Sequence, residues 1–310
     1  MYESPPFRVP FDLRLVRCFT VVAEYRHFGR AAQVLYTTQP SLSRQIRRLE
    51  QQLGTPLFER TPHGNHLTQA GEVFLPLATA LLRCADQAAA RTRAAARPDR
   101  ITIGYTPGVI ITPAVRELRR QHPVAEVATR HLNVHDRRQA LLDHRVDAVV
   151  TRLPFATDGL EVTPLYDELR LLLVPLDHRL AGKESVTLDD IADEPLPKVR
   201  SCDPMVSAFW RIDPRPDGRR APDGPLVEAL EDLIELVAAG QAVFIAPFHP
   251  VRPDLTAIPL EGVEPSHVVL ATRAHDPNHL VAAFRTHARA HLTSQDPTGP
   301  PSGLQRQTDG

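Results

Sequence analysis

Small, polar and cationic side chains recur at helical spacing shortly after Thr38. At about 100° per residue they share one side of a predicted helix: Pro40, Ser43, Arg44 and Arg47. The other side of that helix is apolar and carries Leu42, Ile46, Leu49 and Leu53. A buried apolar stripe beneath an exposed cationic face is typical of a recognition helix in the DNA major groove, where Arg contacts base edges or phosphates.

The flanking residues predict the elements that would hold this helix. Thr38 can cap its N-terminus, Pro40 fits its first turn, and Gly54 can end it as a C-cap. An earlier helix, capped by Asp12, is predicted to run to about Tyr25. A short helix and a tight turn occupy the interval between them. Together these elements predict a helix-turn-helix.

Two further segments follow. Residues Arg60 to Thr68 predict a hairpin with a Gly-Asn turn, which is a wing whose cations would lie against the DNA backbone. Arg60 has two interpretations, a contact with that backbone or a structural ion pair. From Thr68 to about Arg97 we predict one long helix, bent or weakened near Pro76. Its expected apolar stripe is Phe74, Leu77, Ala78, Leu81, Leu82 and Ala85. Dimerisation would explain this stripe, and packing on its own domain is the alternative.

After Pro98 the pattern alternates between strands and helices, which predicts a parallel, doubly wound sheet. A second region is expected from about Tyr166 to Pro265, with a mobile surface loop at Pro214 to Pro225. A closing helix is predicted from His279 to His291. The residues from Ser294 onward have no apolar period, which predicts a disordered tail over 294–310.

Charge and composition narrow the function classes. Residues 1–100 hold 14 Lys and Arg against 8 Asp and Glu, whereas the remainder holds 22 against 29. A basic first part beside an acidic remainder indicates an anionic partner for the first part. We expect no membrane span and no export signal, and hence a cytoplasmic protein. The three cysteines, Cys18, Cys84 and Cys202, are too far apart to indicate a disulfide framework or a zinc site.

The chain resembles the LysR-type transcriptional regulators over about residues 11–292. The resemblance rests on an ordered series of motifs: Phe28 to Ala32, Gln39 to Ile46, Leu49-Glu50, Leu53-Gly54, Leu57 to Arg60 and Leu67 to Gly71. It implies an α/β protein with an N-terminal winged helix-turn-helix, a long linker helix and a two-lobed effector domain like a periplasmic binding protein. The implied ranges are 1–67, 68–97 and 98–293, with lobe I at about 98–164 and 267–293 and lobe II at about 165–266.

The resemblance also implies DNA contacts. The family's groove-facing positions fall on Gln39, Pro40, Ser43 and Arg44, and we add Arg47, Arg60 and His63 as further DNA-binding candidates. His63 stands where the family often has Arg, and a neutral imidazole supplies no fixed charge to the wing. The implied assembly is a homodimer on a pseudo-palindromic operator, and a homotetramer by family resemblance alone.

Distinctive residues follow the predicted strands of the effector domain, where ligands of open α/β sheets bind. These effector candidates are Thr106, Pro107, Asn133, Arg152, Ser201, Cys202 and Pro247. Thr106 and the N-terminus of the following helix would form a donor cluster for a small carboxylate, which Arg152 could clamp bidentately. Alternatively Thr106 only caps its helix, and Arg152 pairs with Asp203 as a closing latch. Cys202 is interpreted as structural or pocket-lining rather than as a redox switch.

Cofactor and metal sites are not expected. Among fourteen histidines, His287 and His291 are the pair that has i, i+4 spacing on a predicted helix, and no third ligand accompanies them in sequence. We therefore expect a solvated helical face there.

The sequence is compatible with three function classes to different degrees. The main hypothesis is a ligand-responsive, DNA-binding regulator. The second is a stand-alone small-molecule binding protein, against which the basic first hundred residues argue. The third is an enzyme, for which the sequence offers no nucleophile–base pair and no glycine-rich phosphate loop.

Overall fold

The structure is a computed structural model that describes residues 11–61, 64–96, 98–200, 203–228, 230–247 and 252–294. The chain forms two compact units, Met1–Arg93 and Ala94–Gly310. Pro62, His63, Arg97, Ser201 and Cys202 lie outside the described residues, as do Ala229, residues 248–251 and the expected tail from Gln295 onward.

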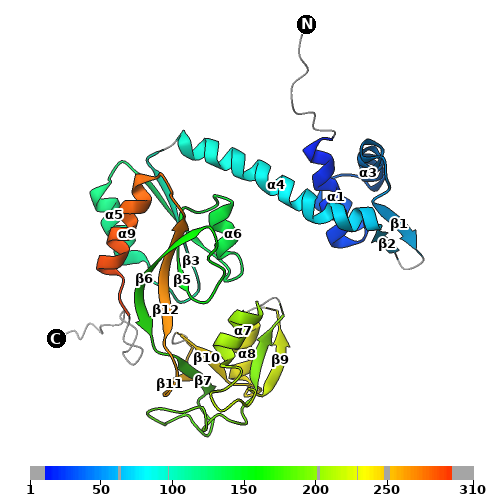
Figure 1. The fold of residues 1–310 in the computed structure, drawn as a ribbon. Coiled ribbons are helices and arrows are strands. Elements are labelled where there is room, and N and C mark those ends of the chain that lie inside the picture. Colours follow the sequence, from blue (N-terminus) through cyan, green and yellow to red (C-terminus); the bar gives the residue numbers. More distant parts are fainter. Residues whose placement is uncertain are drawn as a thin grey trace, which may run out of the picture. The chain divides into compact units, whose positions relative to one another are not determined.

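Unit 1 contains three helices, a hairpin and most of a long fourth helix (Figure 1). The helices are α1 (Leu13–Tyr25), α2 (Phe28–Val34) and α3 (Gln39–Leu53). The hairpin pairs β1 (Phe58–Thr61) with β2 (Gly64–Leu67), and α4 spans Gln69–Ala95. One apolar core joins these elements around the fully buried Phe19, Leu42, Leu49 and Leu57. The predicted helix-turn-helix with a hairpin is confirmed, but the predicted Gly-Asn turn is wrong, because Gly64 and Asn65 lie in β2 and pair with β1.

Local capping explains where the helices begin and end. The Asp12 side chain accepts a hydrogen bond from the Arg14 amide, and Thr38 accepts one from Ser41. Gly54 ends α3 with φ 75°, a left-handed conformation that costs glycine little. His27 caps α2 through its ring nitrogen, which accepts from the amides of Gly29 and Arg30. The sequence predicted the first three caps and missed the histidine.

Gly71 lies where the start of α4 passes close to the chain before the hairpin. The Thr68 hydroxyl accepts a hydrogen bond from the Gly71 amide, as expected of the residue that caps this helix. A Cβ at Gly71 would come within 2.2 Å of the Leu57 carbonyl oxygen. Only glycine therefore permits this close approach between α4 and the chain entering β1.

Gly71→Ala is expected to destabilise unit 1 by about 1–3 kcal/mol, because backbone must shift to admit the new methyl group. Far-UV circular dichroism should show unit 1 unfolding at a lower temperature. The fluorescence of Trp210, the only tryptophan, reports unit 2 and should keep its midpoint. Gln69→Ala, at an exposed position of the same helix, is the control. Unchanged melting of Gly71→Ala would contradict the close approach.

Helix α4 differs from its prediction in two respects. It runs without interruption through Pro76, so the expected weakening does not end the helix. Leu77, placed in the apolar stripe by the sequence, is 60% exposed, whereas Phe74, Leu75, Ala78, Leu81 and Leu82 pack on the core of unit 1. The unit-1 core covers only one side of α4, and Leu77 lies on another.

By length and composition alone, Gln69–Thr92 is long and apolar enough to cross a membrane, contrary to the expectation that no run approaches that length. One such helix is weak evidence for insertion. Arg83 and Asp86 lie within this stretch, where a bilayer would penalise their charges. One edge of the helix is moreover occupied by the core of unit 1.

Unit 2 begins with a five-stranded sheet in the order β4-β3-β5-β12-β6. Its strands are β3 (Arg100–Tyr105), β4 (Glu126–His131), β5 (Ala148–Arg152), β6 (Leu160–Glu168) and β12 (Ser266–Arg273). β3 is parallel to β4 and to β5, whereas β12 is antiparallel to β5 and to β6. The sheet is therefore mixed, which corrects the prediction of an all-parallel sheet. β12 runs the other way because the chain returns to lobe I after building lobe II.

Helices cover both faces of this sheet (Figure 1). α5 (Thr112–Gln121) and α9 (His279–His291) pack on one face, in a core that includes Ile103, Leu118 and Phe284. α6 (Arg137–Leu142) packs on the opposite face, against Val149 and Val269. The sheet with these three helices is called lobe I. Its three layers confirm the predicted doubly wound arrangement.

The remaining elements form lobe II. Its sheets have the orders β10-β7-β11 and β8-β9. The strands are β7 (Leu171–Pro175), β8 (Leu196–Val199), β9 (Asp223–Val227), β10 (Phe244–Ala246) and β11 (Leu255–Pro259). The helices are α7 (Pro204–Arg211) and α8 (Leu230–Ala238). The sequence did not predict β6, β9 or β11.

The predicted surface loop at Pro214 to Pro225 is confirmed in part: Pro214 and residues 216–220 are exposed and lie outside helices and strands, and the expected mobility stays a prediction. Arg215 is only 7% exposed and donates hydrogen bonds to the carbonyl oxygens of Leu188 and Ile191. Arg211 reaches the carbonyl oxygens of Ala221 and Pro222, and β9 begins at Asp223. These two buried arginines therefore anchor the segment at both ends, because hydrogen bonds to main-chain carbonyls, and for Arg211 also ion pairs with Asp213 and Asp223, offset the cost of their desolvation.

Candidate functional sites

The outer face of α3 is the first candidate site. Gln39, Pro40, Arg44 and Arg47 are exposed, and Ser43 is half-buried. Leu42, Ile46 and Leu49 are buried on the opposite side, as the spacing predicted. The structure therefore brings together five of the seven predicted DNA-binding residues on one helix. Their contacts with DNA stay a prediction.

Packing behind α3 holds its outer face in place. The buried Cys18 thiol of α1 donates a hydrogen bond to Gln45 Oε1 across 2.8 Å. Burial also raises the pKa of the Cys18 thiol, which keeps it in the donor form. The Phe19 ring contacts the rings of Phe58 and Phe74, with centroids 5.3 and 5.1 Å away. The same apolar core thus supports α3, the hairpin and α4.

The hairpin is tied to α3 by Glu50, whose carboxylate accepts hydrogen bonds from the amides of Leu57 and Phe58. This makes Glu50 a positioning residue that the sequence motif contains but the prediction did not use. Of the two wing candidates, Arg60 has its main chain in β1. The Arg60 side chain and all of His63 lie outside the described residues, so both stay predictions.

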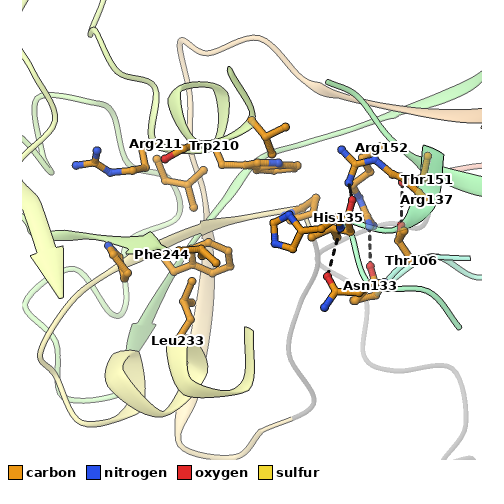
Figure 2. A pocket seen from close by; sticks show the side chains of 18 of the residues that line it. Thr106, Asn133, His135, Arg137, Thr151, Arg152, Trp210, Arg211, Leu233 and Phe244 are labelled. Carbon is orange, nitrogen blue, oxygen red and sulfur yellow. Dashed lines mark hydrogen bonds between the residues drawn. The ribbon is translucent and has the colours of Figure 1, made fainter. Parts of the chain in front are cut away.

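The second candidate site is a cavity of about 330 Å³ between the two lobes of unit 2. Lobe I contributes mostly polar side chains, among them Thr106, His131, Asn133, His135, Thr151 and Arg152. Lobe II contributes mostly apolar ones, among them Leu196, Val206, Trp210, Leu233, Phe244 and Pro247. Figure 2 shows the two groups facing each other, with the His135 ring between them. The cavity is therefore amphipathic.

Thr106 forms the buried end of the polar wall. It is 1% exposed, and its hydroxyl donates a hydrogen bond to the Thr151 hydroxyl across 3.1 Å. It does not cap α5, which begins at Thr112 with Ile111 at its N-cap. The capping alternative is therefore wrong, whereas the donor cluster of Thr106 with the N-terminus of this helix stays a prediction. A turn at Pro107 and Gly108 separates Thr106 from the helix.

Arg152 is buried and is tied to its own lobe. Its guanidinium donates two hydrogen bonds to the Glu168 carboxylate, at 2.6 and 3.1 Å, and others to the carbonyl oxygens of Pro107 and Gly108. The predicted latch with Asp203 is wrong, because Asp203 instead accepts from the Met205 amide and caps α7. Arg152 still lines the cavity beside Asn133 and Pro107, so its role toward an effector stays a prediction.

The Arg152–Glu168 pair is largely desolvated. Burial raises the pKa of the Glu168 carboxyl, and the adjacent Arg152 guanidinium opposes that rise. Burial, together with the charge of Glu168, also raises the pKa of Tyr166 to about 12. The Tyr166 hydroxyl is therefore neutral at physiological pH. This buried pair fixes the turn that forms one wall of the cavity.

Aromatic residues form the apolar wall, and the sequence prediction missed them. Trp210 and Phe244 line the cavity on the lobe II side (Figure 2). The Arg170 guanidinium lies 3.8 Å from the centroid of the Phe209 ring and donates to the Phe209 carbonyl oxygen, which orients this end of α7. The available signal was the single tryptophan of the sequence, which lies on α7.

Four of the seven predicted effector residues lie together on lobe I, namely Thr106, Pro107, Asn133 and Arg152, and Pro247 lies across the cavity on lobe II. Ser201 and Cys202 lie outside the described residues. Choosing the residues that follow the predicted strands therefore located the cavity. Among the residues that the structure describes, this choice included only one from the apolar wall, Pro247.

Comparisons with known proteins agree with this architecture. Residues 95–293 match the family model of the LysR substrate binding domain, and residues 13–72 match that of the bacterial regulatory helix-turn-helix protein, lysR family. The uncharacterized HTH-type transcriptional regulator YnfL of Escherichia coli (strain K12) is 34% identical over 247 residues, which cover 76% of this chain and 82% of YnfL. The HTH-type transcriptional regulator AlsR of Bacillus subtilis (strain 168) is 33% identical over 190 residues, covering 60% and 63%.

Solved structures show the same likeness. The LysR family transcriptional regulator CbnR superposes with a TM-score of 0.62 at 25% identity, covering 90% of this chain and 99% of that one. Full-length CbnR complexed with its target DNA gives a TM-score of 0.51 at 26% identity, with the same coverage. The described chain is thus similar to complete regulators of this type.

Proposed function

Because the chain belongs to the LysR family of transcriptional regulators, we propose that α3 reads operator DNA and that the cavity of unit 2 senses a small molecule. The observation that supports this most directly is the exposed, cationic face of α3 on a fully buried apolar core. In this proposal residues 1–67 bind DNA, 68–97 link the parts, and 98–293 bind the effector. The cavity is assigned no catalytic step, and the protein is placed in the cytoplasm, where its DNA is.

On the DNA side, Gln39, Pro40, Ser43 and Arg44 face the major groove, while Arg47 and the wing residues Arg60 and His63 contact phosphates. The net positive charge of residues 1–100 supports this assignment, since the rest of the chain is acidic. A homodimer would place two α3 helices on half-sites about one helical turn apart. The exposed Val73 and Leu77 of α4 are candidates for the dimer contact. A homotetramer rests on the family alone.

On the effector side, the cavity favours a small molecule with a polar head and an apolar body. Hydroxyl and amide groups of Thr106, Thr151 and Asn133 line the lobe I wall. The guanidinium groups of Arg137 and Arg152 also line this wall, and Arg152 is paired with Glu168. Guanidinium groups are suited to recognising carboxylates, which favours an anionic head group. Trp210 and Phe244 would hold the apolar body.

The proposed response is a population shift. An effector that contacts both walls binds the closed arrangement of the lobes more tightly than an open one, and it can move the equilibrium only by that difference in affinity. Closure would then alter the placement of the DNA-binding units of the oligomer.

Titration of the full-length protein with small aromatic and aliphatic carboxylates tests the effector site. A ligand in the cavity should change the fluorescence of Trp210, and Thr106→Val should weaken its binding about 5- to 50-fold because a buried hydroxyl partner is lost. The corresponding amides should bind more weakly than the carboxylates. His267→Ala, at an exposed site of the same unit, is the control. The assignment would be contradicted if Thr106→Val bound the ligand as tightly as the parent chain and if the amides bound as tightly as the carboxylates.

A further inference from the structure

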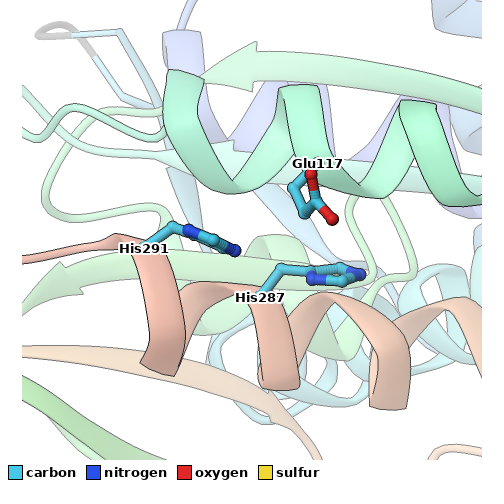
Figure 3. Close-up of side chains that lie close together, drawn as sticks. All are labelled: Glu117, His287 and His291. Carbon is cyan, nitrogen blue, oxygen red and sulfur yellow. The ribbon is translucent and has the colours of Figure 1, made fainter.

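Three metal-ligating side chains meet on the helical face of lobe I. His287 and His291 are one turn apart on α9, and Glu117 projects toward them from α5 (Figure 3). One ligand atom from each residue lies within 4.8 Å of those of the other two. The sequence could not show this group because Glu117 is far from the histidines along the chain. None of the three residues lines the cavity between the lobes.

The expected solvated face is wrong for one of the two histidines. His287 is only 6% exposed, because α9 presses it against α5, while His291 is exposed. Burial is the main cause that lowers the pKa of His287, with a contribution from the neighbouring His291. The neutral imidazole is the form that binds a metal ion, and burial favours that form of His287.

The scaffold behind the three residues is rigid. Leu118, next to Glu117, is fully buried in the lobe I core, and so are Phe284 and Ala288 on the same helix as the histidines. α5 and α9 therefore cannot separate without exposing this core. The His291 side is open to solvent, which provides an entry path.

Glu117 is ionised but has other partners. Hydrogen bonds from Arg120, and then from Gln121, lower the pKa of the Glu117 carboxyl to about 2. Arg120 Nε lies 2.8 Å from one carboxylate oxygen, and Gln121 Nε2 lies 2.7 Å from the other. The Arg120 side chain is itself exposed, so its guanidinium can move into water at small cost. Arg120 therefore competes with any cation for this carboxylate.

We propose that Glu117, His287 and His291 bind one divalent transition-metal ion of the zinc class. Two imidazole nitrogens with one carboxylate oxygen suit Zn²⁺, Co²⁺ or Ni²⁺ and disfavour Mg²⁺ and Ca²⁺, which prefer oxygen ligands. Water would complete the coordination. Tetrahedral ligands at about 2.0–2.1 Å from zinc lie about 3.3 Å apart, so rotation of the exposed His291 and release of Arg120 would close the site.

The ion would cross-link α5 to α9 and thereby stabilise lobe I. A ligand that binds only the folded chain raises its unfolding midpoint in proportion to the logarithm of its concentration. This effect requires neither DNA nor an effector, so the proposal goes beyond the proposed function and stands apart from it.

The test uses the full-length protein after treatment with a chelator. Isothermal titration with ZnCl₂ should show one site per chain, and CoCl₂ should give the visible absorption of Co²⁺ bound by nitrogen and oxygen ligands. His291→Ala and Glu117→Gln should each weaken Zn²⁺ binding at least tenfold, and zinc should no longer raise their unfolding midpoints. His267→Ala removes an exposed histidine that pairs with Asp167, and this control should bind Zn²⁺ like the parent chain.

Arg120→Gln provides the sharper test. It removes the guanidinium that competes with the metal ion for the Glu117 carboxylate, and it leaves all three proposed ligands in place. It should tighten Zn²⁺ binding several-fold, and MgCl₂ should give no such site in any variant. The proposal is overturned if Glu117→Gln and His291→Ala bind Zn²⁺ as the parent does, or if His267→Ala loses as much affinity as they do. Weakened binding by Arg120→Gln would equally contradict it.

Discussion

Arg44→Ala is expected to reduce the affinity for operator DNA about 10- to 100-fold, the loss of one base-specific arginine contact worth about 1–3 kcal/mol. Arg44 lies on the exposed side of α3, opposite the buried Ile46 and Leu49, so its removal leaves the fold intact. Gel-shift and footprinting on the intergenic region beside its own gene measure the effect. Binding to unrelated DNA should fall much less, which separates base readout from general charge attraction.

Two further variants complete this experiment. Arg116→Ala removes the same charge from the exposed face of α5 in unit 2 and should leave operator affinity unchanged. Arg47→Ala should weaken binding to all sequences alike and reduce its salt dependence, as expected of a phosphate contact. If Arg44→Ala keeps full operator affinity at physiological salt, α3 is not the reading element, and the chain would act as a binding protein without this DNA contact.

Glu168→Ala is expected to destabilise unit 2 by about 3–5 kcal/mol, because it leaves the buried Arg152 guanidinium without its carboxylate. The same change frees the turn at Pro107 and Gly108, whose carbonyl oxygens depend on the position of Arg152. Thermal unfolding followed by Trp210 fluorescence should show a clearly lower midpoint. Any effector that binds in the cavity should also bind more weakly.

Asp167→Ala is the matched control for this prediction. Asp167 is the neighbouring carboxylate, and it pairs with the exposed His267, so its loss should change stability by less than about 1 kcal/mol. The double substitution Arg152→Met with Glu168→Leu removes both charges and should recover much of the stability lost in Glu168→Ala. Equal midpoints for Glu168→Ala and Asp167→Ala would show that the buried pair does not hold the lobe together.

Helix positions were predictable because their determinants are local. Asp12, Thr38 and Gly54 act on amides and carbonyls within a few residues, so reading neighbours in sequence suffices. The strands of lobe II were harder. β6 was missed because it contains Pro164, a residue that usually excludes a strand, and the register of β12 against β6 shifts beside it, between Val268 and Val269. The register shift in β12 accommodates the proline, and the residues around Pro164 in the sequence do not indicate it.

For charged residues, the sequence predicted some of their locations but not their partners or their burial. Arg152 was singled out correctly as a residue of the cavity, but its assumed partner Asp203 was wrong and Glu168 was the actual one. Arg215 sits in a segment whose composition indicates an exposed loop, yet it is buried on main-chain oxygens. A buried charge takes whichever partner the tertiary fold brings within hydrogen-bond distance, since the cost of leaving it unpaired exceeds local preferences.

The sequence by itself determined the two faces of α3, the caps that bound it and the succession of elements, because periodicity and capping are interactions over one or two helical turns. Only the tertiary structure decided the amphipathic cavity, the Arg152–Glu168 pair and the meeting of Glu117 with His287 and His291. Each of these joins side chains from separate elements. Their proximity depends on how strands and helices pack around shared cores, and residue spacing along the chain does not encode it.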